Sequence, residues 1–287
     1  MCAVLIVLAG LIALITAHPA EHTLLPRKSD FGCGSEPTKE FIATAQAMAA
    51  QEENGELFMT TATLEIATYF HLVTAKANEV SDTQLQQQIV VMNENYAPYG
   101  ISFNVIGIDK TINSRWAYDQ AELEMKGALR KGNYKTLNVY FQTSLGGNLG
   151  YCYFPTSGAT PGSTILIRDG CAILAQSVPG GSSTNFNLGK TVTHEVGHWF
   201  GLFHTFQGGC DGGDSVADTP AQASPSSGCP IGRDSCSATG LDPVHNYMDY
   251  SDDSCYEEFT EGQKTRMYNM FHKYRAQAGD ESSIVVI

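Results

Sequence analysis

The stretch His194-Glu195-Val196-Gly197-His198-Trp199-Phe200-Gly201-Leu202-Phe203-His204 follows the pattern H-E-x-x-H-x-x-G-x-x-H. In a helix, His194 and His198 are four residues apart, so both imidazoles leave one face and can hold a single metal ion. Gly201 tolerates a positive φ, so the chain can leave the helix abruptly and return His204 as a third ligand. Three neutral imidazoles leave a fourth tetrahedral position for water, which is typical of a catalytic zinc site.

The glutamate between the first two histidines is placed beside the metal and not on it. Zinc brings the pKa of its bound water toward neutrality, and Glu195 can act as the general base that takes a proton from this water. The same carboxyl group can then hand the proton to a leaving amine. An inactive zinc-binding relative would normally have lost this glutamate or a histidine, and none is missing.

A methionine turn follows farther along the chain, in Asn246-Tyr247-Met248-Asp249-Tyr250. The zinc-binding pattern together with such a turn is the signature of the metzincin metallopeptidases. The residues around both motifs resemble the pappalysin family of metzincins, and within it the fungal extracellular metalloproteases. The resemblance covers most of the chain after the leader, but its specific residues lie between Lys190 and Cys255. Astacin-like and reprolysin-like proteases are the alternative subfamilies.

The resemblance implies a secreted zinc-dependent endopeptidase that hydrolyses peptide bonds in proteins. It implies that Met248 forms an apolar floor under the three histidines and does not bind zinc. Tyr250 would donate a hydrogen bond to the oxyanion, with an ordinary core or rim tyrosine as the alternative. We expect protein or peptide substrates and a monomer. The alternative function is a secreted zinc-binding module without turnover.

Composition agrees with a globular extracellular protein. Hydrophobic residues make up 43% of the 287 residues and charged residues 16%, which is globular and not disordered. The formal net charge of −13 argues against nucleic acid or an anionic membrane surface as a partner. An acidic surface also suits calcium sites or cationic substrate side chains, and charge alone does not choose between them.

The chain begins with an apolar run that ends at Ala17. This run is short for a membrane span and closes on a small residue, so residues 1–17 are predicted to be a secretory signal peptide. No Lys or Arg precedes the apolar run, which leaves an uncleaved anchor as the alternative. Residues 18–45 are interpreted as an N-terminal or pro segment, and residues 46–287 as the metalloprotease catalytic domain.

Cysteine usage agrees with secretion, because seven cysteines remain once Cys2 is assigned to the leader. Six cysteines allow fifteen connectivities, and the residues alone do not select one. The resemblance suggests two interleaved disulfides, Cys210 with Cys236 and Cys229 with Cys255, and Cys152 with Cys171 would then be a local one. Such disulfides would stabilise a loop-rich region that has little core of its own.

Cys33 is left over in the segment Phe31-Gly32-Cys33-Gly34. A thiolate is a good zinc ligand, so this cysteine could fill the open coordination position and keep the enzyme latent. The alternative is an unpaired or differently paired cysteine without a role.

Apolar periodicity, caps and chain breakers predict helices and strands in alternation. The predicted helices are 40–53, 81–97, 117–130, a zinc helix beginning at Asn187 or Thr191, and 260–278. The predicted strands are 60–75, 101–108, 136–141, 145–151 and 164–167. The glycine-rich strand 145–151 is interpreted as the edge strand that pairs with an extended substrate, with an ordinary loop as the alternative.

These elements predict a mixed α/β (α+β) fold, metzincin-like by resemblance. Its upper half would hold a twisted mixed sheet with helices and would end with the zinc helix. The lower half would be irregular and stapled by disulfides, and a substrate cleft would separate the two halves. Within the lower half, Asp211, Asp214 and Asp218 offer hard oxygen ligands that suit calcium, although their spacing is not that of an EF-hand. Related enzymes carry calcium, and a solvated acidic loop is the alternative.

Overall fold

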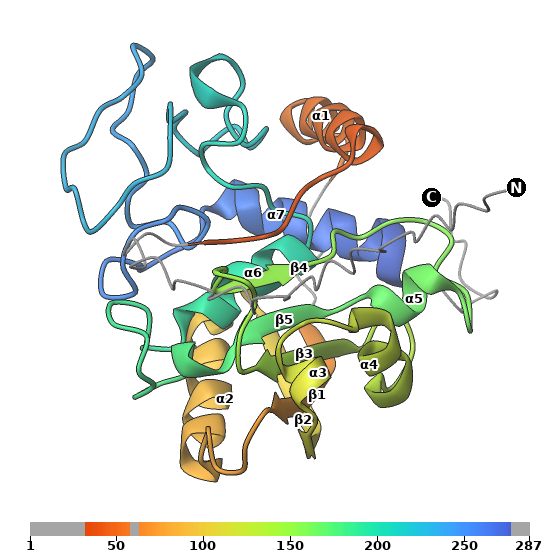
Figure 1. Cartoon of the computed structure of the whole chain (residues 1–287). Coiled ribbons are helices and arrows are strands. Elements are labelled where there is room, and N and C mark those ends of the chain that lie inside the picture. Colours follow the sequence, from red (N-terminus) through yellow and green to blue (C-terminus); the bar gives the residue numbers. More distant parts are fainter. Residues whose placement is uncertain (1–31, 58–62, 277–287) are drawn as a thin grey trace, which may run out of the picture.

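A computed structural model describes residues 32–57 and 63–276 (Figure 1). The predicted signal peptide and residues 18–31 lie outside this range. The helices are α1 Lys39–Glu53, α2 Asp82–Tyr96, α3 Ser114–Ala117, α4 Glu122–Leu129, α5 Thr164–Arg168, α6 Lys190–Trp199 and α7 Glu261–Met270. The strands are β1 Leu64–Thr74, β2 Ile101–Ile112, β3 Leu137–Gln142, β4 Gly150–Cys152 and β5 Cys171–Leu174. A π-helical turn, Phe271–Ala276, continues α7.

The upper half is built around one five-stranded mixed sheet with the strand order β2-β1-β3-β5-β4. All pairings are parallel except that of the edge strand β4, which runs antiparallel to β5. All six residues of β3 are buried, as expected for a strand covered on both faces. Helices α2 and α6 bury Leu85, Met92 and Val196 with the apolar side chains of one face. On the other face, Met125 of α4 packs with Val73 and Tyr140.

The half that follows α6, called the lower half above, is drawn at the top of Figure 1 in blue-green to blue. It is largely irregular until α7 begins. Two disulfides cross-link it, Cys210–Cys236 and Cys229–Cys255, and a third, Cys152–Cys171, ties the edge strand β4 to β5. The first two are the pairs that the resemblance suggested, and the third is the local pair expected alongside them. Cross-links of this kind stabilise a segment with few apolar residues mainly by restricting its unfolded state.

Helix α1 is attached to the C-terminal part of the chain. Its Phe41 and Met48 pack with Phe203 and Met270, and Glu52 forms a 2.8 Å ion pair with the buried Arg266 of α7. The expected boundary between residues 45 and 46 falls inside this continuous helix. No structural boundary lies there, and the division into a pro segment and a catalytic domain stays a prediction.

Two predicted elements differ from the structure. Residues 164–167 form the start of helix α5 and not a strand, because the Ser163 hydroxyl caps the helix by accepting from the Leu166 amide at 3.2 Å. The strand of this region is β5, whose four residues are too few to give a periodic signal. The predicted helix 117–130 begins only at Glu122, as α4, because Ala117 is the last residue of the separate helix α3 and Asp119 adopts a positive φ of 56°.

Candidate active site and metal centre

The helix that carries the first two histidines, α6, ends one residue after the second of them. Gly201 follows with a φ of 97°, a left-handed conformation that favours glycine, and its amide bonds the His198 carbonyl at 2.9 Å. A side chain at this position would also meet Met270 at 2.8 Å. The chain therefore turns sharply here, and the turn returns His204 to the side of α6 that carries His194 and His198.

The three imidazoles meet at one point through their Nε2 atoms. The Nε2 of His198 lies 3.2 Å from that of His194 and 3.0 Å from that of His204. All three side chains are almost completely buried. With the Sγ of Cys33, these nitrogen atoms form a group whose members all lie within 4.8 Å of one another.

The protonation states of the histidines suit a cation at this point. The Nδ1 of His194 lies 2.6 Å from the Tyr247 carbonyl, and that of His198 lies 2.7 Å from the Leu202 carbonyl. A carbonyl only accepts, so each Nδ1 carries the proton and each Nε2 is left with a lone pair. Burial lowers the pKa of His198 to about 4 and that of His204 well below its ordinary value, so both are neutral. Converging lone pairs of neutral imidazoles are the donor set of zinc.

Glu195 lies beside this centre and not in it. Its side chain is buried, and its Oε2 accepts from the Ser35 hydroxyl at 3.1 Å and lies 3.4 Å from the Cys33 sulfur. Its Oε1 has no hydrogen-bond partner among the described residues. Burial raises the pKa of Glu195 to about 8, against the lowering effect of its hydrogen bonds. Gly150 of β4 must be glycine here, because a methyl group would lie 2.6 Å from the Glu195 Cγ.

The methionine turn lies under the histidines. Met248 is fully buried, and its sulfur packs on Gly197 of α6. Tyr250 is half-buried, with its ring centroid 4.9 Å from that of His204 and 5.8 Å from that of His194. Burial raises the pKa of the Tyr250 hydroxyl, so this group stays protonated and can donate a hydrogen bond. The predicted oxyanion donor is therefore near the predicted metal ligands.

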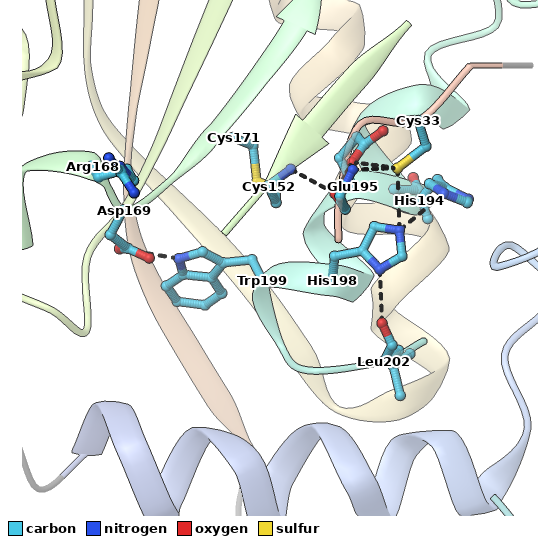
Figure 2. The surroundings of a disulfide bond; sticks show 12 residues. Cys33, Cys152, Arg168, Asp169, Cys171, His194, Glu195, His198, Trp199 and Leu202 are labelled. Atoms are coloured by element: carbon cyan, nitrogen blue, oxygen red, sulfur yellow. Dashed lines mark hydrogen bonds between the residues drawn. A yellow bond between two sulfur atoms is a disulfide. The ribbon is translucent and has the colours of Figure 1, made fainter. Parts of the chain in front are cut away.

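The segment around Cys33 pairs with the free edge of β4, and Figure 2 shows the Cys33 sulfur beside Glu195 and His198. The Gly34 amide donates to the Gly150 carbonyl at 2.9 Å, and the Leu149 amide donates to the Gly32 carbonyl at 2.6 Å. The Cys33 sulfur lies 3.4 Å from the His198 Nε2. The predicted substrate edge is thus paired with the chain's own N-terminal segment, although regular strand begins only at Gly150.

The three acidic residues considered for calcium are not gathered at one point. Asp211 is exposed, whereas the carboxylate of Asp218 caps α7 by accepting from the Thr260 hydroxyl and the Gly262 amide. Asp214 is buried, and its Oδ1 accepts from the Val216 amide at 2.9 Å. None of the three belongs to a metal-ligating group of His, Cys, Asp and Glu in the described part of the chain.

Sequence reasoning missed two residues that touch the site. Ser35 bridges the Glu195 carboxylate and the Cys152 amide, which donates to its hydroxyl at 2.9 Å. The ring of Phe154 lies edge-on to His198, with 5.2 Å between centroids, and its other neighbours include Phe41 and Phe203. Neither residue lies in a recognisable motif, so only their positions after folding reveal the contacts.

The fold and this site define a zinc metallopeptidase of the metzincin class. Residues 123–272 match the Peptidase_M43 family, described as pregnancy-associated plasma protein-A. An extracellular metalloprotease of Colletotrichum graminicola is 59% identical over 91% of this chain and 96% of its own. Extracellular metalloprotease 1 of Coccidioides posadasii is 58% identical over 85% of this chain and 90% of its own.

A solved structure agrees with these matches. Mature mirolysin of Tannerella forsythia, in complex with a cleaved peptide, is 29% identical with a TM-score of 0.62, over 77% of this chain and 94% of that chain. The chain therefore belongs to the Peptidase_M43 or pappalysin family, and the resemblance seen in its sequence is confirmed. Among the described residues, no helix is long and apolar enough to cross a membrane.

Proposed function

We propose that this chain is a secreted zinc endopeptidase in which His194, His198 and His204 hold the metal and Glu195 is the general base. The observation that carries the proposal is the convergence of three buried Nε2 atoms next to a buried carboxylate. The extracellular location rests on the names of the fungal relatives. A zinc-binding module without turnover is not favoured, because it has no use for a buried glutamate at this point.

When bound, zinc would polarise the scissile carbonyl and lower the pKa of the attacking water, so that this water loses a proton more easily near neutral pH. Glu195 takes the proton of the attacking water and returns it to the leaving amine. Tyr250 donates a hydrogen bond to the oxygen that becomes negatively charged. The edge of β4 binds the substrate backbone by strand pairing.

Hydrolysis of casein with and without a zinc chelator tests the proposal. We expect the chelator to abolish hydrolysis and added zinc to restore it. Without the metal, the scissile carbonyl is not polarised and the pKa of the attacking water is not lowered. Hydrolysis that persists in the chelator, in a sample shown to be free of metal, would contradict the assignment.

We further propose that Cys33 keeps the unprocessed chain latent. Its sulfur is within 4.8 Å of the three Nε2 atoms, where a fourth ligand would bind. The backbone on both sides of Cys33 pairs with β4, and Ser35 engages Glu195. The segment thus covers the expected positions of the fourth ligand, the substrate strand and the general base together.

The variant Cys33→Ala is expected to raise the activity of the unprocessed chain at least about tenfold, equivalent to 1.4 kcal/mol. A thiol-modifying reagent should have the same effect on the wild-type chain and none on Cys33→Ala. If neither the substitution nor the reagent increases activity, Cys33 has no part in latency.

Calcium in the loop after α6 stays a prediction from the resemblance. Asp214 is the buried member of the acidic set, and burial raises the pKa of its carboxyl to about 7. The folded-state pKa of Asp214 lies above its unfolded value, so the protonated carboxyl contributes to the stability of the fold. This contribution is fully present below about pH 4 and is lost as the pH rises through about 7.

In calcium-free buffer, Asp214→Asn is expected to remove this loss, which amounts to about 4 kcal/mol at most. The measurement is the free energy of unfolding of both proteins between pH 4 and pH 8. Added calcium should stabilise the wild type at pH 8 and leave Asp214→Asn unchanged. Equal stabilisation of both proteins would exclude a calcium ion at Asp214.

A further inference from the structure

The zinc helix α6 begins without a capping side chain of its own. Its N-cap is Gly189, and no side chain next to it in sequence accepts from the amides of the first turn. The acceptor comes instead from the loop after the methionine turn. The Oδ2 of Asp253 accepts from the Leu188 amide at 2.8 Å and from the Lys190 amide at 3.4 Å. A carboxylate at this place satisfies unpaired amides and interacts favourably with the helix dipole.

Further bonds join the same two segments. The Asp253 amide donates to the Asn185 carbonyl at 2.9 Å, and the Lys190 ammonium donates to the Tyr256 carbonyl. Asp253 is completely buried, and its Oδ1 has no hydrogen-bond partner among the described residues. A buried carboxylate with one oxygen unpaired is costly to the fold, so stability alone is a poor reason for its presence.

The loop that carries Asp253 also touches α6 at the metal centre. The Tyr247 carbonyl accepts from the His194 Nδ1 at 2.6 Å, and Met248 packs on Gly197. His194 lies one helical turn after Lys190, whose backbone amide donates a hydrogen bond to Asp253. A shift of the helix start relative to the loop would therefore disturb the contacts that orient His194.

We propose that Asp253 is a positioning residue that fixes the start of α6 against the methionine-turn loop and so sets the place of His194 and His198. This proposal rests on the proposed function of the site. It assigns to Asp253 an action through the helix, without contact to substrate or metal.

The test compares two carboxylates that cap helices from a distance. Asp253→Ala removes the cap of α6, and Asp253→Asn removes the charge but keeps an accepting oxygen. The control is Asp218→Ala, because Asp218 also accepts from a first-turn amide, that of Gly262, and α7 carries none of the proposed metal ligands. Asp218 is exposed, and α7 keeps its own N-cap, Thr260. All variants are made in the full chain with Cys33→Ala also present, so that latency does not mask activity.

Asp253→Ala is expected to lower kcat about tenfold, the usual size of an effect on ligand orientation. Its KM should stay within about twofold of the parent value, since the β4 edge is untouched. With cobalt in place of zinc, the visible absorption bands should shift. In the metal-free chain, hydrogen exchange in the first turn of α6 should accelerate. Asp253→Asn keeps an accepting oxygen but loses the charge, so it should show the same changes at a smaller size. Asp218→Ala should lower only the melting temperature.

Equal kcat and identical cobalt spectra in Asp253→Ala and Asp218→Ala would overturn the proposal. If Asp253→Ala does not fold, Asp253→Asn decides, because unchanged cobalt bands and unchanged exchange in that variant would also overturn it. A wild-type chain without chelator-sensitive activity would reject the proposed function. The cobalt spectrum and the exchange of α6 would still decide on Asp253.

Discussion

Glu195→Gln is expected to lower kcat by about 10²-fold to 10⁴-fold, the contribution of a well-placed general acid or base. Glutamine has nearly the same shape and keeps an oxygen that can accept from Ser35. It cannot take a proton, however, whereas the Glu195 carboxylate lies beside the group of three histidines and Cys33, with its Oε2 3.4 Å from the Cys33 sulfur. The loss should appear in kcat and in kcat/KM alike, because proton transfer belongs to the transition state.

The zinc content separates this explanation from a collapsed site. Glu195→Gln should bind as much zinc as the wild type, since the metal ligands are untouched. Glu94→Gln is the matched control, because Glu94 is exposed on α2 and should have no effect on kcat. A Glu195→Gln protein that keeps its zinc and most of its activity would show that another group moves the proton.

Asp169→Leu is expected to lower the free energy of unfolding by about 3 to 5 kcal/mol, the cost of leaving buried charges without a partner. Asp169 is buried between two arginines, with its Oδ1 3.1 Å from Arg275 and its Oδ2 3.3 Å from Arg130. The side chain of Arg275 is fully buried, and that of Arg130 nearly so. Leucine would leave both guanidinium groups without a carboxylate.

The same network holds the end of the zinc helix. The indole nitrogen of Trp199 donates to the Asp169 Oδ2 at 3.3 Å, as Figure 2 shows, and Arg275 donates to the Trp199 carbonyl at 3.1 Å. Arg275 also lies over the Trp199 ring, 3.7 Å from its centroid. The guanidinium group therefore binds the C-terminal end of α6, where a cation interacts favourably with the helix dipole.

Thermal unfolding tests the prediction for Asp169→Leu. We expect its melting temperature to fall by about 10 °C or more in a chain of this length. The control is Asp82→Asn, which breaks the exposed pair with Lys110 and should cost at most about 1 kcal/mol. Similar losses in the two variants would mean that the Asp169 network adds nothing beyond an ordinary surface ion pair.

The metal centre was predictable from sequence because its geometry is local. The spacing of His194 and His198 places both on one helix face, and Gly201 accounts for the turn before His204. The order of strands and helices similarly predicted a mixed sheet, which the structure confirms. The disulfide pairs came only from the resemblance, since residue spacing does not select among connectivities.

What sequence reasoning missed depends on contacts between distant segments. Asp253 caps a helix that begins 63 positions earlier, and Ser35 reaches Glu195 across 160 positions. Residues 164–167 carry strand-forming side chains, but the Ser163 cap and the packing of α5 against α4 favour a helix. Local preferences cannot anticipate such competition, because tertiary contacts decide it.

The most direct test of the account is anomalous scattering at the zinc absorption edge, from crystals of the full chain grown without added metal. The account predicts a peak at the meeting point of the His194, His198 and His204 Nε2 atoms, with Glu195 beside it. A zinc peak held by other residues, or no peak in a preparation that still hydrolyses casein, would contradict it.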